Sequence, residues 1–138
     1  MIRIAVALMA VASPASAQLT PLSFELGKSL PLAAGNWNYV VTANGGEARF
    51  GSHLSLVCDK PTRTVTISRP AALASALTVV TDMQTRTLAP NGRLSAYDPL
   101  LDAMAFSRGR FLVSGGNAAV LAVPSWPEAA RAIEDCRI

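Results

Sequence analysis

The chain has 138 residues and a formal net charge of +3, and these two quantities already limit its class. A chain of this length allows one domain and leaves little room for a second. Its twelve basic residues are scattered rather than clustered, so neither nucleic acid nor an anionic membrane is supported as a partner.

The first seventeen residues have the three parts of a cleavable signal peptide. Arg3 supplies the positive charge, residues 4–12 form a short apolar run, and Ala15-Ser16-Ala17 offers small residues for cleavage before Gln18. A membrane-spanning helix needs about 20 apolar residues, roughly twice this run. Residues 1–17 are therefore predicted to be a signal peptide. We expect a periplasmic or secreted protein with no membrane span after cleavage.

The two cysteines, Cys58 and Cys136, both follow this signal. In an oxidising compartment, two lone cysteines most simply pair with each other. Together with the single histidine, His53, they make a poor ligand set for a metal, and the sequence has no C-x-x-C motif. We expect a structural disulfide, with no metal and no cofactor.

Residues 18–35 contain two prolines and two glycines without a regular period. We expect an N-terminal arm here, with a short strand near Phe24, followed by a single globular domain over residues 36–138. Apolar residues alternate in 36–42, 54–58 and 64–68, as in half-buried strands. Turn signals at 44–46 and 59–62 join them, with residues 47–50 as a return strand. Residues 77–81 predict another strand that 85–89 continue, before a turn at 90–92.

Two helices are expected in the last third of the chain. Asp98 precedes Pro99 as an N-cap before a proline in the first turn, and Gly109 would end that helix. Residues 110–113 and 118–123 predict a hairpin. Residues 125–128 (SWPE) have the form of a capping box in which Ser125 starts the second helix. That helix would bury Ala129, Ile133 and Cys136 in one stripe.

These elements predict an α+β fold. Hairpins with short turns give an antiparallel β-sheet, sandwich-like or curved, and the two short helices would cover one face of it. The disulfide would tie the C-terminal helix to the strand that carries Cys58.

Four charged residues stand out as candidate ligand or partner contacts. Asp98 and Asp102 are four positions apart on one helix face, either as paired carboxylates for acid–base work or calcium, or as an N-cap and a favourable helix-dipole charge. Arg108 and Arg110 flank Gly109, either as a fork for a carboxylate or phosphate, or as charges that complement a helix end. In each pair the capping explanation is favoured.

Aromatic residues and His53 are further candidates, and Trp126 joins the four charged residues as a candidate ligand or partner contact. The aromatic residues either form a platform for a ligand or, as is more common, belong to the core; they are Trp37, Tyr39 and Trp126. Of these, Trp126 is the better contact residue, because it stands at a helix start. His53 is the only histidine, the residue type that most often serves as a general base, yet no G-x-S-x-G motif surrounds any serine. No catalytic residue is predicted.

Several strings together resemble a group of small, uncharacterised exported proteins of Gram-negative bacteria. They are Trp37-x-Tyr39, Glu47-Ala48-x-Phe50, Leu56-x-Cys58, Arg63-x-Val65-x-Ile67, DPLLDAMAFSRGRF (98–111) and PSWPEAARAIEDCR (124–137). The resemblance implies a periplasmic or secreted domain and no particular activity. The chain is also faintly similar to the invasion-associated locus B proteins, which are exported and disulfide-bonded, but it lacks their additional cysteines.

Three functional hypotheses remain open from the sequence. The favoured one is a binding or interaction module for an unknown protein or a small anionic ligand in the envelope, for example an inhibitor of an envelope enzyme. The second is a small hydrolase-type enzyme with a carboxylate or His53 as base. The third is an envelope stress protein that acts by assembly.

Overall fold

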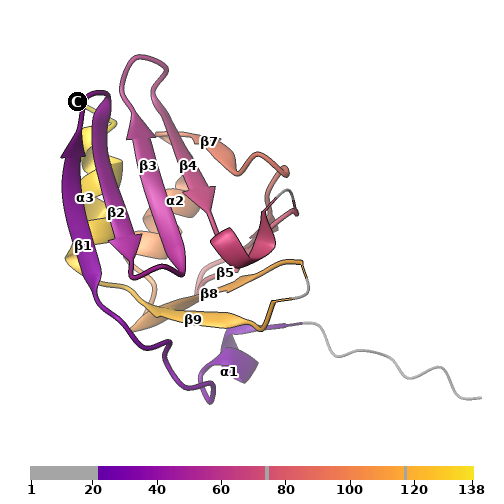
Figure 1. Cartoon of the computed structure of the whole chain (residues 1–138). Helices are drawn as coiled ribbons and strands as arrows, with labels where there is room; N and C mark the ends of the chain where they lie inside the picture. The colour runs from indigo at the N-terminus through magenta and orange to yellow at the C-terminus, as the bar shows by residue number, and fades with distance from the viewer. Residues whose placement is uncertain (1–21, 74, 117) are drawn as a thin grey trace, which may run out of the picture.

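Two antiparallel sheets and three short α-helices make up the part of the chain that the computed structural model describes, residues 22–73, 75–116 and 118–138 (Figure 1). The predicted signal peptide, residues 1–17, lies outside these residues. Within them, no helix is long and apolar enough to cross a membrane.

The first sheet has the strand order β1-β2-β3-β4-β7. Its strands are β1 (Trp37–Thr42), β2 (Gly45–Phe50), β3 (Leu54–Asp59), β4 (Thr64–Ser68) and β7 (Arg93–Ser95). The two hairpins expected over 36–68 are confirmed, with Trp37 opposite Phe50 in the first and Cys58 opposite Val65 in the second. β7 was not expected, because its three residues follow a turn signal and show no apolar alternation.

The second sheet has the order β6-β5-β8-β9, and its strands run across the direction of the first sheet in Figure 1. The strands are β5 (Thr78–Val80), β6 (Thr85–Thr87), β8 (Arg110–Ser114) and β9 (Leu121–Pro124). The predicted hairpin of residues 110–123 is confirmed. Residues 85–89 do not continue the preceding strand as expected, because a turn at 81–84 folds β6 back antiparallel to β5.

The helices are α1 (Phe24–Gly27), α2 (Pro99–Ala105) and α3 (Pro127–Asp135), with a 3₁₀ turn, η1, at Pro70–Ala72. α3 packs on β1, β2 and β3, and α2 packs beside α3 (Figure 1). Ala129, Ile133 and Cys136 are buried together, as the sequence predicts for one helix stripe.

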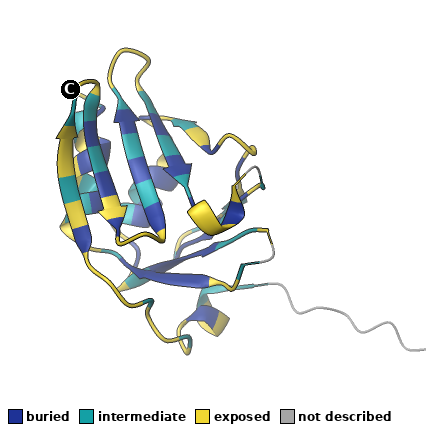
Figure 2. Cartoon of the chain, in the orientation of Figure 1, coloured by how far each residue is buried: buried dark blue, intermediate teal, exposed yellow. Residues whose placement is uncertain are grey.

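One hydrophobic cluster joins both sheets to α2 and α3. Phe50 and Ile67 enter it from the first sheet, Phe111 from the second, Met104 from α2 and Ile133 from α3. Burial alternates along β3 and β4, whereas β9 is buried along its whole length (Figure 2). A strand buried on every residue must be covered on both faces.

The cover on the other face of the second sheet is the N-terminal arm. Leu22, Phe24 and Leu30 pack on Val80, Leu112 and Ala122, which form a second small hydrophobic cluster. The strand expected near Phe24 is wrong, because the Ser23 hydroxyl accepts a hydrogen bond from the Leu26 amide at 3.2 Å and starts the single turn of α1.

Two predicted helix ends also differ from the structure. The capping box at Ser125 is wrong: α3 begins at Pro127 with Trp126 as the N-cap and no side-chain cap bond. Proline lacks an amide proton and therefore favours the first helical position, which moves the cap to the residue before it. α2 ends at Ala105 rather than at Gly109, although Gly109 does adopt a positive φ of 72° in the following turn.

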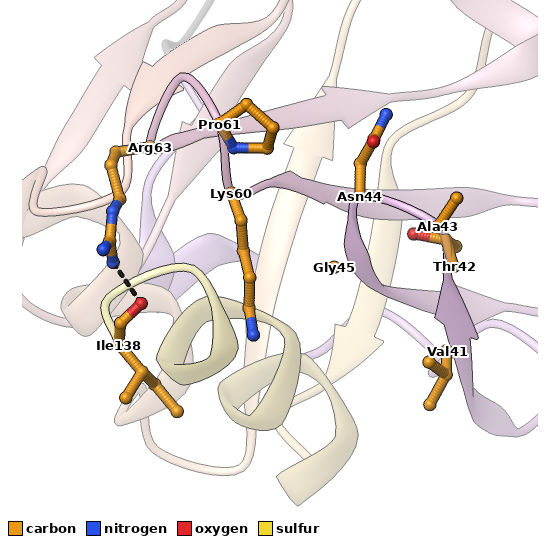
Figure 3. Close-up of a pocket in the computed structure, with 9 residues that line it drawn as sticks. All are labelled: Val41, Thr42, Ala43, Asn44, Gly45, Lys60, Pro61, Arg63 and Ile138. Carbon is orange, nitrogen blue, oxygen red and sulfur yellow. Dashed lines mark hydrogen bonds between the residues drawn. The ribbon is translucent and has the colours of Figure 1, made fainter.

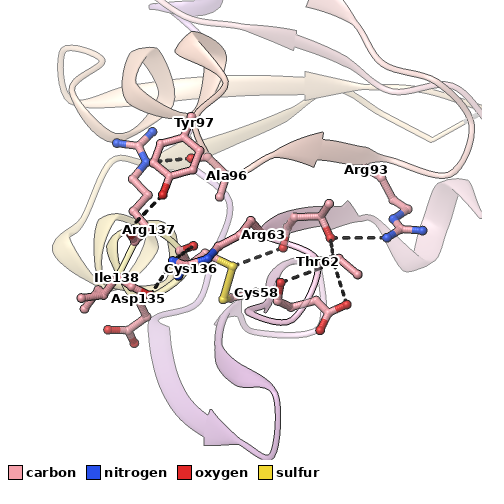
Figure 4. Close-up of a disulfide and its surroundings, with 12 residues drawn as sticks. Cys58, Thr62, Arg63, Arg93, Ala96, Tyr97, Asp135, Cys136, Arg137 and Ile138 are labelled. Carbon is pink, nitrogen blue, oxygen red and sulfur yellow. Dashed lines mark hydrogen bonds between the residues drawn. A yellow bond between two sulfur atoms is a disulfide. The ribbon is translucent and has the colours of Figure 1, made fainter.

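The predicted disulfide between Cys58 of β3 and Cys136 at the end of α3 is confirmed (Figure 4). Next to it, Arg63 donates hydrogen bonds to the Cys136 and Ile138 carbonyl oxygens. The last residues of the chain are thus held to the β3–β4 hairpin by one covalent bond and by a side chain from its turn.

Candidate binding site

The turn between β5 and β6 is built around the side chain of Thr81. Its hydroxyl accepts hydrogen bonds from the Met83 and Gln84 amides, at 3.2 and 3.0 Å, and donates to the Gln84 carbonyl oxygen at 2.9 Å. Thr81 itself is only 3% exposed. A side chain that satisfies the polar groups of its own turn fixes the turn's shape, and Met83 projects from this fixed turn with 79% of its surface exposed.

Asp82 ties this turn to the loop that follows α2. Its amide donates to the Ser107 hydroxyl at 3.1 Å, and its carboxylate accepts a hydrogen bond from the Arg108 amide at 3.3 Å. Ser107 is buried, and the exposed Arg108 side chain lies 3.7 Å from the same carboxylate, which is itself largely buried. The two loops therefore form one unit, with Met83 on one loop and Phe106 on the other.

Between this unit and α2 lies a hollow of about 350 Å³, which we call the α2 groove. It is lined by Asp82, Met83, Gln84, Pro99, Asp102, Ala103 and Phe106. Phe106 is 78% exposed, whereas Ala103 is buried. The groove thus has two exposed, large apolar side chains and carboxylates among its lining residues.

The two predicted carboxylates stand on α2 beside this groove, and each has its own cation. Asp98 caps α2 by accepting from the Leu100 amide at 2.9 Å and pairs with Arg86. Asp102 accepts two hydrogen bonds from Arg137, at 2.7 and 3.2 Å. The hydrogen bond that Arg137 donates to Asp102 raises the pKa of Arg137, and the burial of Arg137 opposes this shift. The two carboxylates are therefore held in separate ion pairs.

Arg108 and Arg110 point to different partners. Arg108 pairs with Asp82 next to the α2 groove, while the Arg110 guanidinium donates to the Gly27 carbonyl oxygen at 3.2 Å and to that of Leu30 in the N-terminal arm. Of the four charged residues that the sequence singles out, only Asp102 lines the groove, with Arg108 paired to another of its lining residues. Arg110 instead fastens the arm to the second sheet.

The remaining sequence candidates lie elsewhere. Trp126 is 43% exposed at the N-cap of α3, which agrees with its expected partial exposure. His53 lies exposed after β2 with its ring 6.1 Å from that of Phe50, and Trp37 and Phe50 pack together in the core. Tyr39 is half-buried, with Arg131 over its ring and its hydroxyl donating to Asp135.

A second, larger hollow of about 520 Å³ lies beside the C-terminus (Figure 3). It is lined by the β1–β2 turn, the β3–β4 turn and Ile138, and its lining side chains point in different directions in Figure 3. Arg63 is already engaged with Ile138. We therefore take the smaller α2 groove, with two exposed apolar side chains on hydrogen-bonded loops, as the better candidate site.

No protein-family model, curated protein or solved structure matches this chain. The function must therefore be inferred from the chemistry of the site. Among the described residues, no three His, Cys, Asp or Glu side chains gather into a metal-binding cluster. The groove offers apolar contact area bordered by side chains that already pair with one another, which suits binding better than proton transfer.

Sequence reasoning did not find Met83, Phe106 or Asp82. The string Thr81-Asp82-Met83-Gln84 carried a usable signal, because Thr and Asp commonly bond the backbone of turns between two β segments. The exposure of Phe106 had no such signal. Phe106 is the C-cap residue of α2 and is 78% exposed.

Proposed function

We propose that this protein is an exported binding module that engages a partner protein through the α2 groove. The observation that carries this proposal is the pair Met83 and Phe106, which are 79% and 78% exposed and line the same hollow. Large exposed apolar side chains beside a hollow are typical of protein–protein contacts, in which phenylalanine and methionine are enriched.

The preferred partner is a protein that inserts an apolar side chain between Met83 and Phe106. The hollow, about 350 Å³, is at the small end of the range of about 300–1,000 Å³ for small-molecule pockets. Its walls are exposed rather than enclosing, and its carboxylates already face Arg108 and Arg137. A partner would thus gain mainly from apolar burial, for which a protein surface supplies more area than a small molecule.

Order within the site supports the same proposal. Binding costs less conformational entropy when the contacting loops are already fixed. Here the Thr81 hydroxyl fixes one loop and Asp82 joins it to the other. The module presents Met83 and Phe106 on a framework that does not need to rearrange.

Export is part of the proposal and rests on the sequence of residues 1–17 together with the Cys58–Cys136 bond. Disulfides persist mainly in oxidising compartments such as the periplasm. An envelope enzyme is a suitable partner class, with the module as its inhibitor. Export is tested by N-terminal sequencing of the protein recovered from outside the cytoplasm, which should begin at Gln18.

The site is tested by placing a photo-crosslinking amino acid at position 83 or 106 in the full chain in cells. Both positions should give the same discrete adduct, and position 73 should not, because Leu73 is similarly exposed at 74% but lines a different hollow next to η1. With the partner identified and purified, Met83→Ala and Phe106→Ala should each weaken binding by about tenfold or more, and Leu73→Ala should not. Equal adducts at all three positions, or none, would refute the α2 groove as the binding site.

A further inference from the structure

Edge strands expose unpaired backbone groups, and natural proteins usually shorten, charge or cover them. Of the four sheet edges in the described part of the chain, three are shortened, charged or covered in this way. β7 and β6 have three residues each and carry Arg93 and Arg86. β9 is covered because the Ala33 amide donates to the Ala122 carbonyl oxygen at 2.9 Å and the Trp37 indole donates to that of Pro124 at 2.7 Å.

β1 differs from these three edges. It has six residues, WNYVVT, with no charge and no proline, and within the described residues it pairs only with β2. Val40 and Val41 are 41% and 75% exposed on it. In Figure 1 it forms the outer edge of the first sheet.

The register of the hairpin shows which backbone groups of β1 are free. Thr42 and Gly45 flank a two-residue turn, and such a flanking pair is hydrogen-bonded. Hydrogen-bonded and non-hydrogen-bonded pairs alternate along an antiparallel hairpin. The Gly51 amide donates to the Asn36 carbonyl oxygen at 3.2 Å, so the pair Asn36–Gly51 is hydrogen-bonded, as this alternation requires. Amides and carbonyls of Trp37, Tyr39 and Val41 therefore point away from β2, toward the open side of the sheet.

We propose that this edge binds a second copy of the same chain, with the two β1 strands antiparallel about Tyr39. In that register each Tyr39 faces its counterpart and each Trp37 faces Val41 of the other copy. All outward amides and carbonyls of the three residues then find partners. The result is an isologous twofold contact, the commonest symmetry of homo-oligomers, with the two first sheets continuous across it.

Charges next to the edge favour a copy of the chain over an unrelated strand. Arg131 of α3 lies over the Tyr39 ring, 4.0 Å from its centre, and Asp135, one turn later, accepts the Tyr39 hydroxyl hydrogen bond. Because the twofold axis reverses direction, α3 of one copy runs opposite to α3 of the other. Each copy brings one positive and one negative side chain beside its Tyr39, so two copies meet without an excess of charge of one sign, and β1 itself brings no charge that would repel its copy.

The test is analytical ultracentrifugation of the oxidised chain from residue 18 over a range of concentrations. The unmodified protein should show a monomer–dimer equilibrium. Val41→Lys, which places a charge on the edge, and Val41→Pro, which removes an outward amide proton, should each raise the dimer dissociation constant about tenfold or more. Leu73→Lys is the matched control, because Leu73 is equally exposed at 74% and should leave the equilibrium unchanged.

Hydrogen exchange then tests the register. The amides of Tyr39 and Val41 should become protected as concentration rises, while that of Met83 should not. A strict monomer, or a dimer that both Val41 variants leave intact, would overturn the proposal. So would a monomer whose β1 edge binds an added extended peptide instead. The two Val41 variants do not alter the α2 groove, so this result is independent of the function proposed above.

Discussion

Cys58 and Cys136 are separated by 78 positions in the sequence, yet their Cα atoms lie 5.5 Å apart and their sulfurs are bonded. Both residues are almost completely buried in the main hydrophobic cluster. The bond holds the last turn of α3 against β3, with Arg63 bonding the residues beside it (Figure 4).

Removing this bond is expected to cost a large share of the stability. Closing a loop of 78 residues restricts the unfolded chain by about 4 kcal/mol. The double variant Cys58→Ser, Cys136→Ser should therefore unfold at a lower urea concentration. Its free energy of unfolding should be smaller by about 4 kcal/mol. The unmodified protein in its reduced form is the control, because it lacks the disulfide but carries no serine substitutions. If reduction and the double substitution both leave the urea midpoint unchanged, the bond does not stabilise the fold.

Removing the side chain at the start of α2 and at the start of α3 should change the free energy of unfolding by different amounts. Asp98 caps α2, so Asp98→Ala should cost about 1 kcal/mol, and Asp98→Asn, which can still cap, should cost less. The Ser125 hydroxyl is buried and has no hydrogen-bond partner among the described residues, so Ser125→Ala should change the free energy of unfolding by less than about 0.5 kcal/mol. Urea denaturation of the three variants measures the free energy of unfolding. Equal decreases for Asp98→Ala and Ser125→Ala would show that Ser125 caps α3 after all.

Tyr39 is expected to ionise at a higher pH than a free tyrosine. Its hydrogen bond to Asp135, its burial and the charge of Asp135 raise its pKa above the ordinary value of 10.0, although Arg131 acts in the opposite direction. Since the folded pKa exceeds the unfolded one, this contribution to stability is complete below pH 10 and is lost as the pH rises through the folded value.

The measurement is tyrosinate absorbance in a Tyr97→Phe variant, because the chain has two tyrosines and this leaves only Tyr39. Adding Asp135→Asn should move the midpoint back toward 10, as it removes the largest cause. A midpoint at or below 10 in the Tyr97→Phe protein would contradict the contact between Tyr39 and Asp135.

Gly27 tests the packing of the N-terminal arm on the second sheet. A methyl group at this buried glycine would collide with the side chain of Leu112, which is fully buried in the sheet. Gly27→Ala should therefore destabilise the fold by about 1–3 kcal/mol, the usual range for overpacking. Leu26→Ala is the control, because Leu26 is 51% exposed one residue earlier. Similar small effects of the two substitutions would show that the arm is not packed there.

Strand and helix patterns near the disulfide were readable from the sequence. Leu54, Leu56 and Cys58 alternate in β3 and are buried, and Ala129 and Ile133 share a buried helix stripe, because each segment has one face against the core. The bonding of the two cysteines followed from their number and the predicted compartment.

Other features depended on contacts that no local pattern encodes. The start of α3 was misplaced because the SWPE string satisfies the capping-box pattern, while Pro127 decides the cap by taking the first helical position. The arm was expected to form a strand near Phe24. Its conformation is instead set by a local Ser23 cap and by the outer face of the second sheet, which only exists after folding.

By itself, then, the sequence determined the α+β class and the hairpins over residues 36–50, 54–68 and 110–123, because periodicity and turn residues act over a few neighbouring positions. It also determined the cysteine pair, because the chain has two cysteines and the predicted compartment is oxidising. Only the tertiary structure decided that Met83 and Phe106 line one groove, that Asp98 and Asp102 bind different arginines, and that β1 is the unprotected edge among the strands of residues 22–73, 75–116 and 118–138. Those relationships join residues far apart in the chain, and their positions follow from how the two sheets and the helices pack together.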